Sequence, residues 1–96
     1  MKIVKLSHPN YEYDVHSLVK AFYAEEQVTV ITPETKPEKL AELEPQVSLE
    51  IELAETGAKI RVGEEDFLWD AEMETIADGY KNGLKRFLYR TLSKVT

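Results

Sequence analysis

The 96-residue chain has no cysteine. A disulfide framework, a zinc site built on thiolates and an iron–sulfur cluster held by cysteines are therefore excluded within it. It has no run of about 20 apolar residues, which a membrane-spanning helix requires. Its first residues, Met1–Leu6, are too short an apolar run for a secretory signal. A glycine-rich phosphate loop is also excluded, because the glycines are scattered at positions 57, 63, 79 and 83.

The length and composition predict one domain, residues 1–96, that folds without disulfides or a bound metal. Hydrophobic residues make up 43% and charged residues 31% of the chain, which is typical of a soluble globular protein. The absence of cysteine suits a reducing compartment, and we expect a cytoplasmic protein with no membrane partner. The formal net charge of −6 argues against a nucleic-acid partner.

The charges are unevenly distributed along the chain. Residues 1–78 hold 7 basic and 18 acidic side chains, a balance of −11, whereas residues 79–96 hold 5 basic side chains and no acidic one. In one long final helix, Asp70 and Asp78 would lie toward the N-terminus and Arg90 toward the C-terminus. The helix dipole favours this arrangement by about 0.3–1 kcal/mol for each well-placed charge, so the asymmetry is first a structural feature.

Hydrophobic spacing predicts the elements of the first half. Residues 2–6 predict a short strand, and Asn10 is a candidate N-cap for an amphipathic helix over residues 11–24. A β-branched run predicts a strand over residues 27–31. Three of the four prolines then fall within residues 32–45, which predicts an exposed loop with one helical turn.

The clearest local signal is a β-hairpin. Apolar side chains alternate with polar ones on both sides of an expected four-residue loop, Ala54–Gly57. A pairing that opposes Ile51 and Ile60 puts every apolar side chain on one face, and a slip by one residue would bury charges. Gly57 is expected to adopt a positive φ in the loop. On the polar face the expected charge pairs are Glu52 with Lys59 and Glu50 with Arg61.

The last third predicts a connector followed by a long helix. Residues 63–69 are the connector, and Asp70 is a candidate N-cap. An apolar stripe that begins at Met73 holds one face to the chain end. The predicted order is β-α-β-β-β-α. We therefore expect an α+β fold of two layers, in which a mostly antiparallel four-stranded sheet carries two helices on one face.

The predicted last helix carries a candidate site. Gly79 and Gly83 each cost about 1 kcal/mol relative to alanine in a helix, and on one continuous helix they share a side with Arg86 and Arg90. One interpretation is a smooth groove that docks a following domain or holds a carboxylate between two cations. The alternative is that the glycines allow close packing within the domain. No glycine or proline ends the helix before Thr96, which favours a piece of a longer protein.

No catalytic, cofactor-binding or metal site is predicted within the chain. The two histidines, His8 and His16, lie near no nucleophile motif, and with Asp14 they match no established metal-ligand spacing. The acidic run Glu64–Asp66 lacks the alternating oxygen ligands of a calcium loop. The apolar run Phe67–Trp69 is expected either to form a hydrophobic staple before the helix or to take part in an interface.

The chain resembles a known family in three segments. Ala77–Thr96 is similar to the end of the N-terminal region of oxygen-independent coproporphyrinogen III oxidase-like proteins. Phe22–Glu26 is similar to the end of the first helix of that region, and the hairpin that begins at Val47 falls where that region also has alternating strands. The resemblance is carried mainly by Leu84, Leu88, Tyr89, Leu92 and Thr96.

The family comprises radical S-adenosylmethionine enzymes of haem biosynthesis, coproporphyrinogen dehydrogenases that oxidatively decarboxylate the propionates of a porphyrinogen. The resemblance implies that the parent protein continues past Thr96 into a radical S-adenosylmethionine barrel, whose cysteines hold a [4Fe–4S] cluster. It assigns no catalytic residue, cofactor or metal ligand to this chain.

We therefore expect a non-catalytic N-terminal accessory domain. Its partner would be its own C-terminal radical S-adenosylmethionine domain, onto which it docks, or for which it positions an anionic substrate, through the row Gly79, Gly83, Arg86 and Arg90. The alternative is a free-standing protein-interaction module without enzymatic activity. That module would bind its partner through Phe67–Trp69 and the hairpin edge.

Overall fold

The computed structural model describes residues 1–71 and 73–96, with the backbone alone for residues 73–78. A short 3-10 turn, Pro9–Tyr11, precedes the first helix, and another, Glu44–Gln46, follows the second. No helix in the described part of the chain is long and apolar enough to cross a membrane. The main elements are β1 (Lys2–Leu6), α1 (Glu12–Phe22), β2 (Val28–Ile31), α2 (Pro37–Leu43), β3 (Val47–Ala54), β4 (Gly57–Val62), β5 (Glu65–Asp70) and α3 (Met73–Val95).

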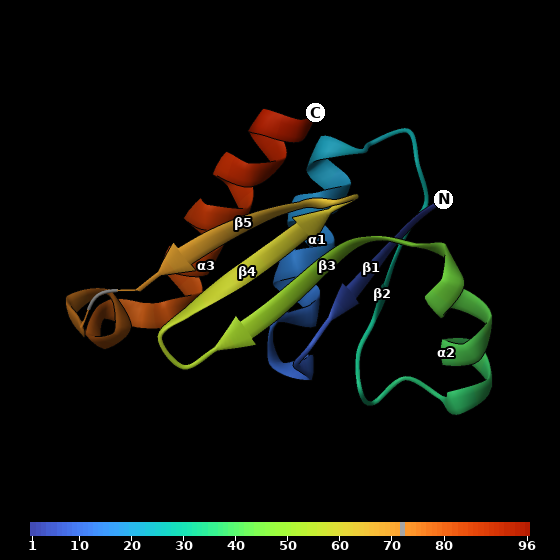
Figure 1. Ribbon diagram of the computed structural model, residues 1–96, viewed down its shortest axis with the longest axis horizontal. Coiled ribbons are helices and arrows are strands. Elements are labelled where there is room, and N and C mark those ends of the chain that lie inside the picture. The colour runs from blue at the N-terminus through green and yellow to red at the C-terminus, as the bar shows by residue number, and fades with distance from the viewer. Residues whose placement is uncertain (72) are drawn as a thin grey trace.

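The strands form one five-stranded mixed sheet in the order β2-β1-β3-β4-β5 (Figure 1). β1 pairs in parallel with β2 and β3, while β3, β4 and β5 form an antiparallel meander. The fold is α+β, as expected, but the prediction of four mostly antiparallel strands is wrong. α1 connects β1 to β2, and α2 connects β2 to β3. Each helix is a crossover connection, which lets the next strand run parallel to the previous one. The fifth strand, β5, replaces the expected connector over residues 63–69.

The pleat of β1 assigns neighbouring residues to opposite faces of the sheet. The described residues form two hydrophobic cores, one on each face of the sheet. Val4 lies in the larger core together with side chains of α1 and α3, whereas Ile3 lies in the smaller one, with Ile31 of β2 and Leu43 of α2. Two helices, α1 and α3, thus cover one face, and α2 covers part of the other face beside β1 and β2 (Figure 1). The expected loop over residues 32–45 contains this third helix. The half of the sheet made by β3, β4 and β5 is left open on the α2 side.

The larger core joins the sheet to one stripe on each covering helix. Tyr80 also ties α3 to the sheet, because its hydroxyl donates a hydrogen bond to the Gly57 carbonyl at 2.6 Å. Burial raises the pKa of Tyr80. Burying one apolar side chain of the larger core contributes roughly 1.5–3 kcal/mol to the free energy of folding. The fully buried side chains of this core include Val4, Leu6, Val15, Val19, Ile51, Ile60, Leu84, Leu88 and Leu92.

The β3–β4 hairpin confirms the predicted register, with Ile51 opposite Ile60. The turn is shorter than expected, since Ala54 pairs with Gly57. The prediction of a positive φ at Gly57 is wrong, because positive φ among glycines occurs at Gly63 and Gly79. Gly57 is required for another reason: a Cβ atom there would lie 2.0 Å from the carbonyl oxygen of Trp69 in the adjacent strand.

The β4–β5 connection is a two-residue turn, Gly63 and Glu64, because Val62 pairs with Glu65. Gly63 has φ of 64°, and no non-glycine residue has positive φ in the part of the chain that the structure describes. A positive φ at the first central residue alone is typical of a type II′ hairpin turn. This turn reverses the chain tightly enough for β5 to extend the sheet.

α3 is not the continuous helix that the sequence predicts. Asp70 is the last residue of β5 rather than a helix N-cap, and the backbone of Gly79 is non-helical, with φ of 119° and ψ of 99°. This conformation is open to glycine and strained for other residues. α3 therefore has a helical segment on each side of Gly79. The predicted roles of Met73 and Asp78 lie outside the described side chains.

We expect Gly79→Ala to destabilise the protein by about 1–3 kcal/mol, because alanine must adopt the strained backbone of the break. A helix that ran through this position would instead gain about 1 kcal/mol from the same change. Urea denaturation measures the sign directly. Ser93→Ala, at an exposed helical position of α3, is the matched control and should be neutral or slightly stabilising. Stabilisation by Gly79→Ala would contradict the break.

Candidate functional site

The predicted row of Gly79, Gly83, Arg86 and Arg90 does not form one continuous surface. Gly79 lies in the break of α3, so its alignment with the other three residues is wrong. Gly83 is buried, whereas Arg86 and Arg90 are exposed. Buried Gly83 agrees with the alternative interpretation, in which a glycine allows close packing inside the domain. The two arginines remain as the candidate contact residues.

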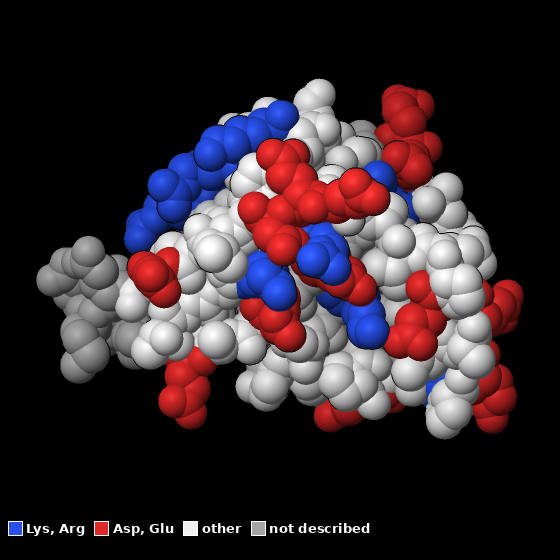
Figure 2. Space-filling view, in the orientation of Figure 1, with Lys and Arg blue, Asp and Glu red and all other residues white. Residues whose placement is uncertain are grey.

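Arg86 and Arg90 belong to a larger surface, the cationic face, which we define as Arg86, Tyr89, Arg90 and Lys94. These residues lie on the solvent side of α3, and Figure 2 shows the band of basic side chains that runs along this helix. Within the described residues, none of the three cations forms an ion pair. Their charge is therefore available to an anionic partner.

The other cations of α3 are used within the domain. The Lys81 ammonium lies 3.3 Å and the Lys85 ammonium 3.9 Å from the carboxylate of Asp14 in α1. Asp14 is largely covered, so this pairing joins the two helices where they meet. The basic residues at the end of the sequence thus form two sets in the structure. Lys81 and Lys85 pair with Asp14 within the domain, and the other cations belong to the cationic face.

The cationic face also has an apolar part, which consists of the Tyr89 ring and a hollow beside it. Tyr89 is 57% exposed, and its ring packs on that of Phe22 in a T-shaped arrangement at a centroid distance of 5.3 Å. A shallow hollow beside it is lined by Leu18, Lys85, Arg86, Tyr89 and Arg90. Arginine and tyrosine around a shallow apolar hollow are typical of protein-interaction surfaces.

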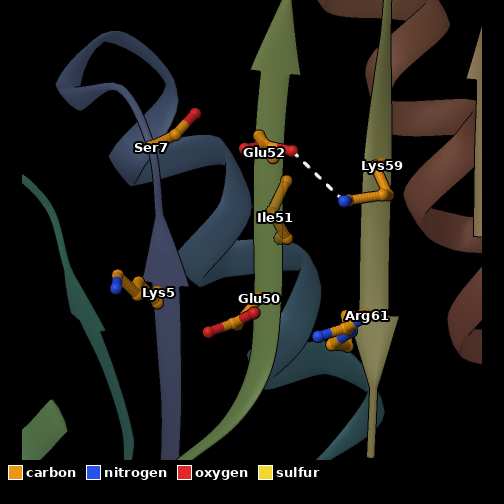
Figure 3. A pocket seen from close by; sticks show the side chains of 7 residues that line it. All are labelled: Lys5, Ser7, Glu50, Ile51, Glu52, Lys59 and Arg61. Carbon is orange, nitrogen blue, oxygen red and sulfur yellow. Dashed lines mark ion pairs between the residues drawn. The ribbon is translucent and has the colours of Figure 1, made fainter. Parts of the chain in front are cut away.

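The open half of the sheet carries rows of alternating charge. In one row Lys5 of β1 is opposite Glu50 of β3, Glu50 is opposite Arg61 of β4, and Arg61 is opposite Asp66 of β5. In the next row Glu52 pairs with Lys59 at 3.5 Å, which confirms that predicted pair. Figure 3 shows Glu50 between Lys5 and Arg61, and the Glu52–Lys59 pair beyond them.

The expected ion pair between Glu50 and Arg61 is replaced by another. Arg61 instead donates from Nε and Nη2 to the two carboxylate oxygens of Asp66, at 2.8 and 3.2 Å. These hydrogen bonds lower the pKa of Asp66 and raise the pKa of Arg61. Sequence reasoning missed this pair because residues 63–69 were expected to be a connector. The Gly-Glu turn at residues 63 and 64 is the signal that predicts a further strand.

The hollow in this open face is lined by Lys5, Ser7, Glu50, Ile51, Glu52, Lys59 and Arg61. Its cations are matched by neighbouring acids, and a further acid, Glu44, lies 2.9 Å from the Lys5 ammonium. The hydrogen bond to Glu44 raises the pKa of Lys5. A surface that neutralises itself in this way does not select a ligand of one charge. We interpret these rows as sheet surface, as the sequence predicts.

The remaining polar candidates are not brought together. His8 accepts a hydrogen bond from the Asn10 backbone N–H at 3.3 Å, so His8 rather than Asn10 caps the turn before α1. His16 lies 3.0 Å from the Val28 carbonyl, and Asp14 binds Lys81. Among the residues that the structure describes, no group of three histidine or acidic side chains converges on a metal position.

The apolar run Phe67–Trp69 lies in β5, so the staple interpretation is wrong, because no helix begins at residue 70. Phe67 and Trp69 pack against the larger core, and the Trp69 ring stacks on Phe87 at a centroid distance of 6.0 Å. Leu68 points to the other face and is 77% exposed. The interface interpretation thus applies to Leu68 alone among the three.

Comparison with known proteins leaves the family of this chain open: no family model matches it, and no curated protein does.

We expect Arg61→Gln to raise the pKa of Asp66 toward its ordinary value of 3.8. Carbon-detected NMR titration of the side-chain carboxyl measures this pKa in both proteins. A depressed folded-state pKa contributes stability that is present above the unfolded pKa and is lost as pH falls through the folded value. The unfolding midpoint of Arg61→Gln should therefore approach that of the unmodified protein as the pH falls through the folded-state pKa of Asp66. Lys85→Gln is the control, and an unchanged Asp66 pKa in Arg61→Gln would contradict the pairing.

Proposed function

We propose that this chain is the non-catalytic N-terminal domain of an oxygen-independent coproporphyrinogen III oxidase-like radical S-adenosylmethionine enzyme of haem biosynthesis, and that it docks onto the rest of that enzyme. The [4Fe–4S] cluster, the S-adenosylmethionine and the oxidative decarboxylation belong to the partner domain. On this proposal the protein is cytoplasmic. The single observation that carries the docking role is the cationic face of α3, where Arg86, Arg90 and Lys94 form no ion pair with a described residue.

Four of the five residues that carry the family resemblance, all except Thr96, divide into two groups. Leu84, Leu88 and Leu92 are buried, so packing within this domain accounts for their similarity. Tyr89 packs on Phe22 within the domain but is still 57% exposed, so more than half of its surface is free to contact a partner. Tyrosine and arginine side chains are enriched at the centres of protein interfaces, so this pattern supports an interface with another domain.

The partner surface is expected to be acidic. Arg86 and Arg90 present planar guanidinium groups, which bind carboxylates through paired hydrogen bonds. The same chemistry suits the positioning of an anionic substrate near the domain boundary, the second role that we propose for this face. Gly83 does not contribute a surface of its own, because it is buried.

A free-standing protein-interaction module is the second candidate function. The observation that favours it is the outer edge of β5, where Leu68 is exposed and no described strand pairs. This candidate needs no catalytic partner domain.

The docking role is tested by mixing this domain with the separately produced radical S-adenosylmethionine domain in a titration calorimeter. We expect the double variant Arg86→Glu, Arg90→Glu to weaken association about tenfold or more, since each tenfold step is about 1.4 kcal/mol and charge reversal at a complementary interface costs several times that. Binding of the unmodified domain should weaken with added salt.

Lys36→Glu, Lys39→Glu is the matched control. It changes the net charge by the same amount, but at α2, on the other side of the sheet. Equal affinities for the two double variants would refute docking through α3.

A further inference from the structure

β5 forms one edge of the sheet, and within the described residues nothing pairs with its outer side (Figure 1). α3 makes its main contacts with α1 and β4, and it meets β5 on the core face, where Trp69 packs on Tyr80 and Phe87. An edge strand exposes a row of unpaired backbone N–H and C=O groups, which is a template for another strand. Short edges, charged side chains, prolines or bulges usually protect such a strand. β5 has six residues, no proline and no lysine, and its charged side chains are all acidic.

The turn decides which backbone groups point outward. The two-residue turn makes Val62 and Glu65 a hydrogen-bonded pair, so alternate residues of β5 bond to β4. The Ala71 N–H donates to the Thr56 carbonyl at 2.7 Å, which continues the same alternation past the strand end. The N–H and C=O groups of Asp66, Leu68 and Asp70 therefore point away from the sheet.

The side chains of these three residues share the open face. Leu68 is 77% exposed, and it lies between exposed Asp66 and exposed Asp70. A hollow of about 430 Å³ beside Leu68 extends to the β3–β4 turn and is also lined by Trp69 and Asp70. An acid, an apolar side chain and an acid thus alternate along an unpaired edge.

We propose that the outer edge of β5 binds an extended basic peptide segment as a sixth strand. Main-chain hydrogen bonds to Asp66, Leu68 and Asp70 supply the affinity, and the side chains set the sequence preference. A lysine or arginine lies opposite each acid, and an apolar side chain lies over Leu68. Asp66 remains able to accept from a second cation, because a carboxylate accepts about four hydrogen bonds and Arg61 uses two.

Charge argues against a second copy of this chain as the occupant. A symmetric antiparallel pair that uses all three outward residues places Asp66 of one copy opposite Asp70 of the other. Two like-charge pairs directly opposite each other are destabilising. The same acids attract a basic strand, so the edge discriminates between these two occupants.

The experiment measures fluorescence anisotropy of a capped, labelled peptide with the core Lys-Thr-Leu-Thr-Lys, titrated with the 96-residue chain. In the bound register the leucine amide faces β5, and the threonine amides face solvent. We expect N-methylation of the leucine to weaken binding about tenfold, from a lost hydrogen bond and a steric clash. N-methylation of a threonine leaves the affinity within about twofold, because that amide makes no bond to the edge.

Two protein variants test the same edge. Leu68→Pro removes an outward N–H without removing a bond to β4, and should weaken binding about tenfold. Asp70→Lys should weaken it about threefold through the cross-strand charge, whereas Glu34→Lys, with the same charge change in the turn after β2, should not. Arg86→Glu should leave the affinity intact, so this result is separable from docking through α3.

Equal binding of the two N-methylated peptides would overturn the proposal, because the affinity would then be general attraction to an acidic protein. Absence of saturable binding would overturn it as well. A dimer of the free chain in sedimentation at micromolar concentration, lost in Leu68→Pro, would assign the edge to a second copy instead.

Discussion

The alternation of side chains along β3, β4 and β5 is the constraint on which the rest of the structure depends. Successive residues of a strand point to opposite faces, so Ile51 and Ile60 enter the core while Glu52 and Lys59 meet on the other side. A slip of one residue would exchange these sets and place charges beneath the helices. The register therefore determines against which face of these strands α1 and α3 pack and which face stays open.

The two candidate binding surfaces follow from this layering. Because the core side is closed by α1 and α3, the solvent side of α3 presents Arg86, Tyr89 and Arg90 outward. Because β5 ends the sheet, its outer backbone groups are available on another surface. Their charges are opposite: the α3 surface is cationic, and the β5 edge carries Asp66 and Asp70. The two partners that we propose, an acidic surface and a basic strand, differ in charge for this reason.

Local patterns predicted the elements in which alternation or helical spacing is unbroken. The hairpin register was correct because Leu49, Ile51 and Ile60 alternate strictly with polar or charged residues. β5 was missed because Phe67, Leu68 and Trp69 are consecutively apolar, although only two of them pack on the core. The parallel pairing of β1 depends on contacts between distant segments, which local spacing does not encode.

The candidate site was predicted only in part, again for a physical reason. A helical wheel assumes one rotation per residue throughout, and Gly79 interrupts that rotation. Arg86 and Arg90 kept their exposed positions because they lie beyond the break. The pairing of Arg61 with Asp66 depended on β5, so it was out of reach without that strand.

Amide hydrogen exchange along β5 of the free protein, followed by NMR, tests the alternation most directly. The alternation predicts slow exchange at Glu65, Phe67 and Trp69, whose N–H groups face β4, and fast exchange at Asp66, Leu68 and Asp70. Uniformly slow exchange would mean that the outer edge is covered. Uniformly fast exchange would mean that β5 is not part of the sheet, and either result would contradict the account.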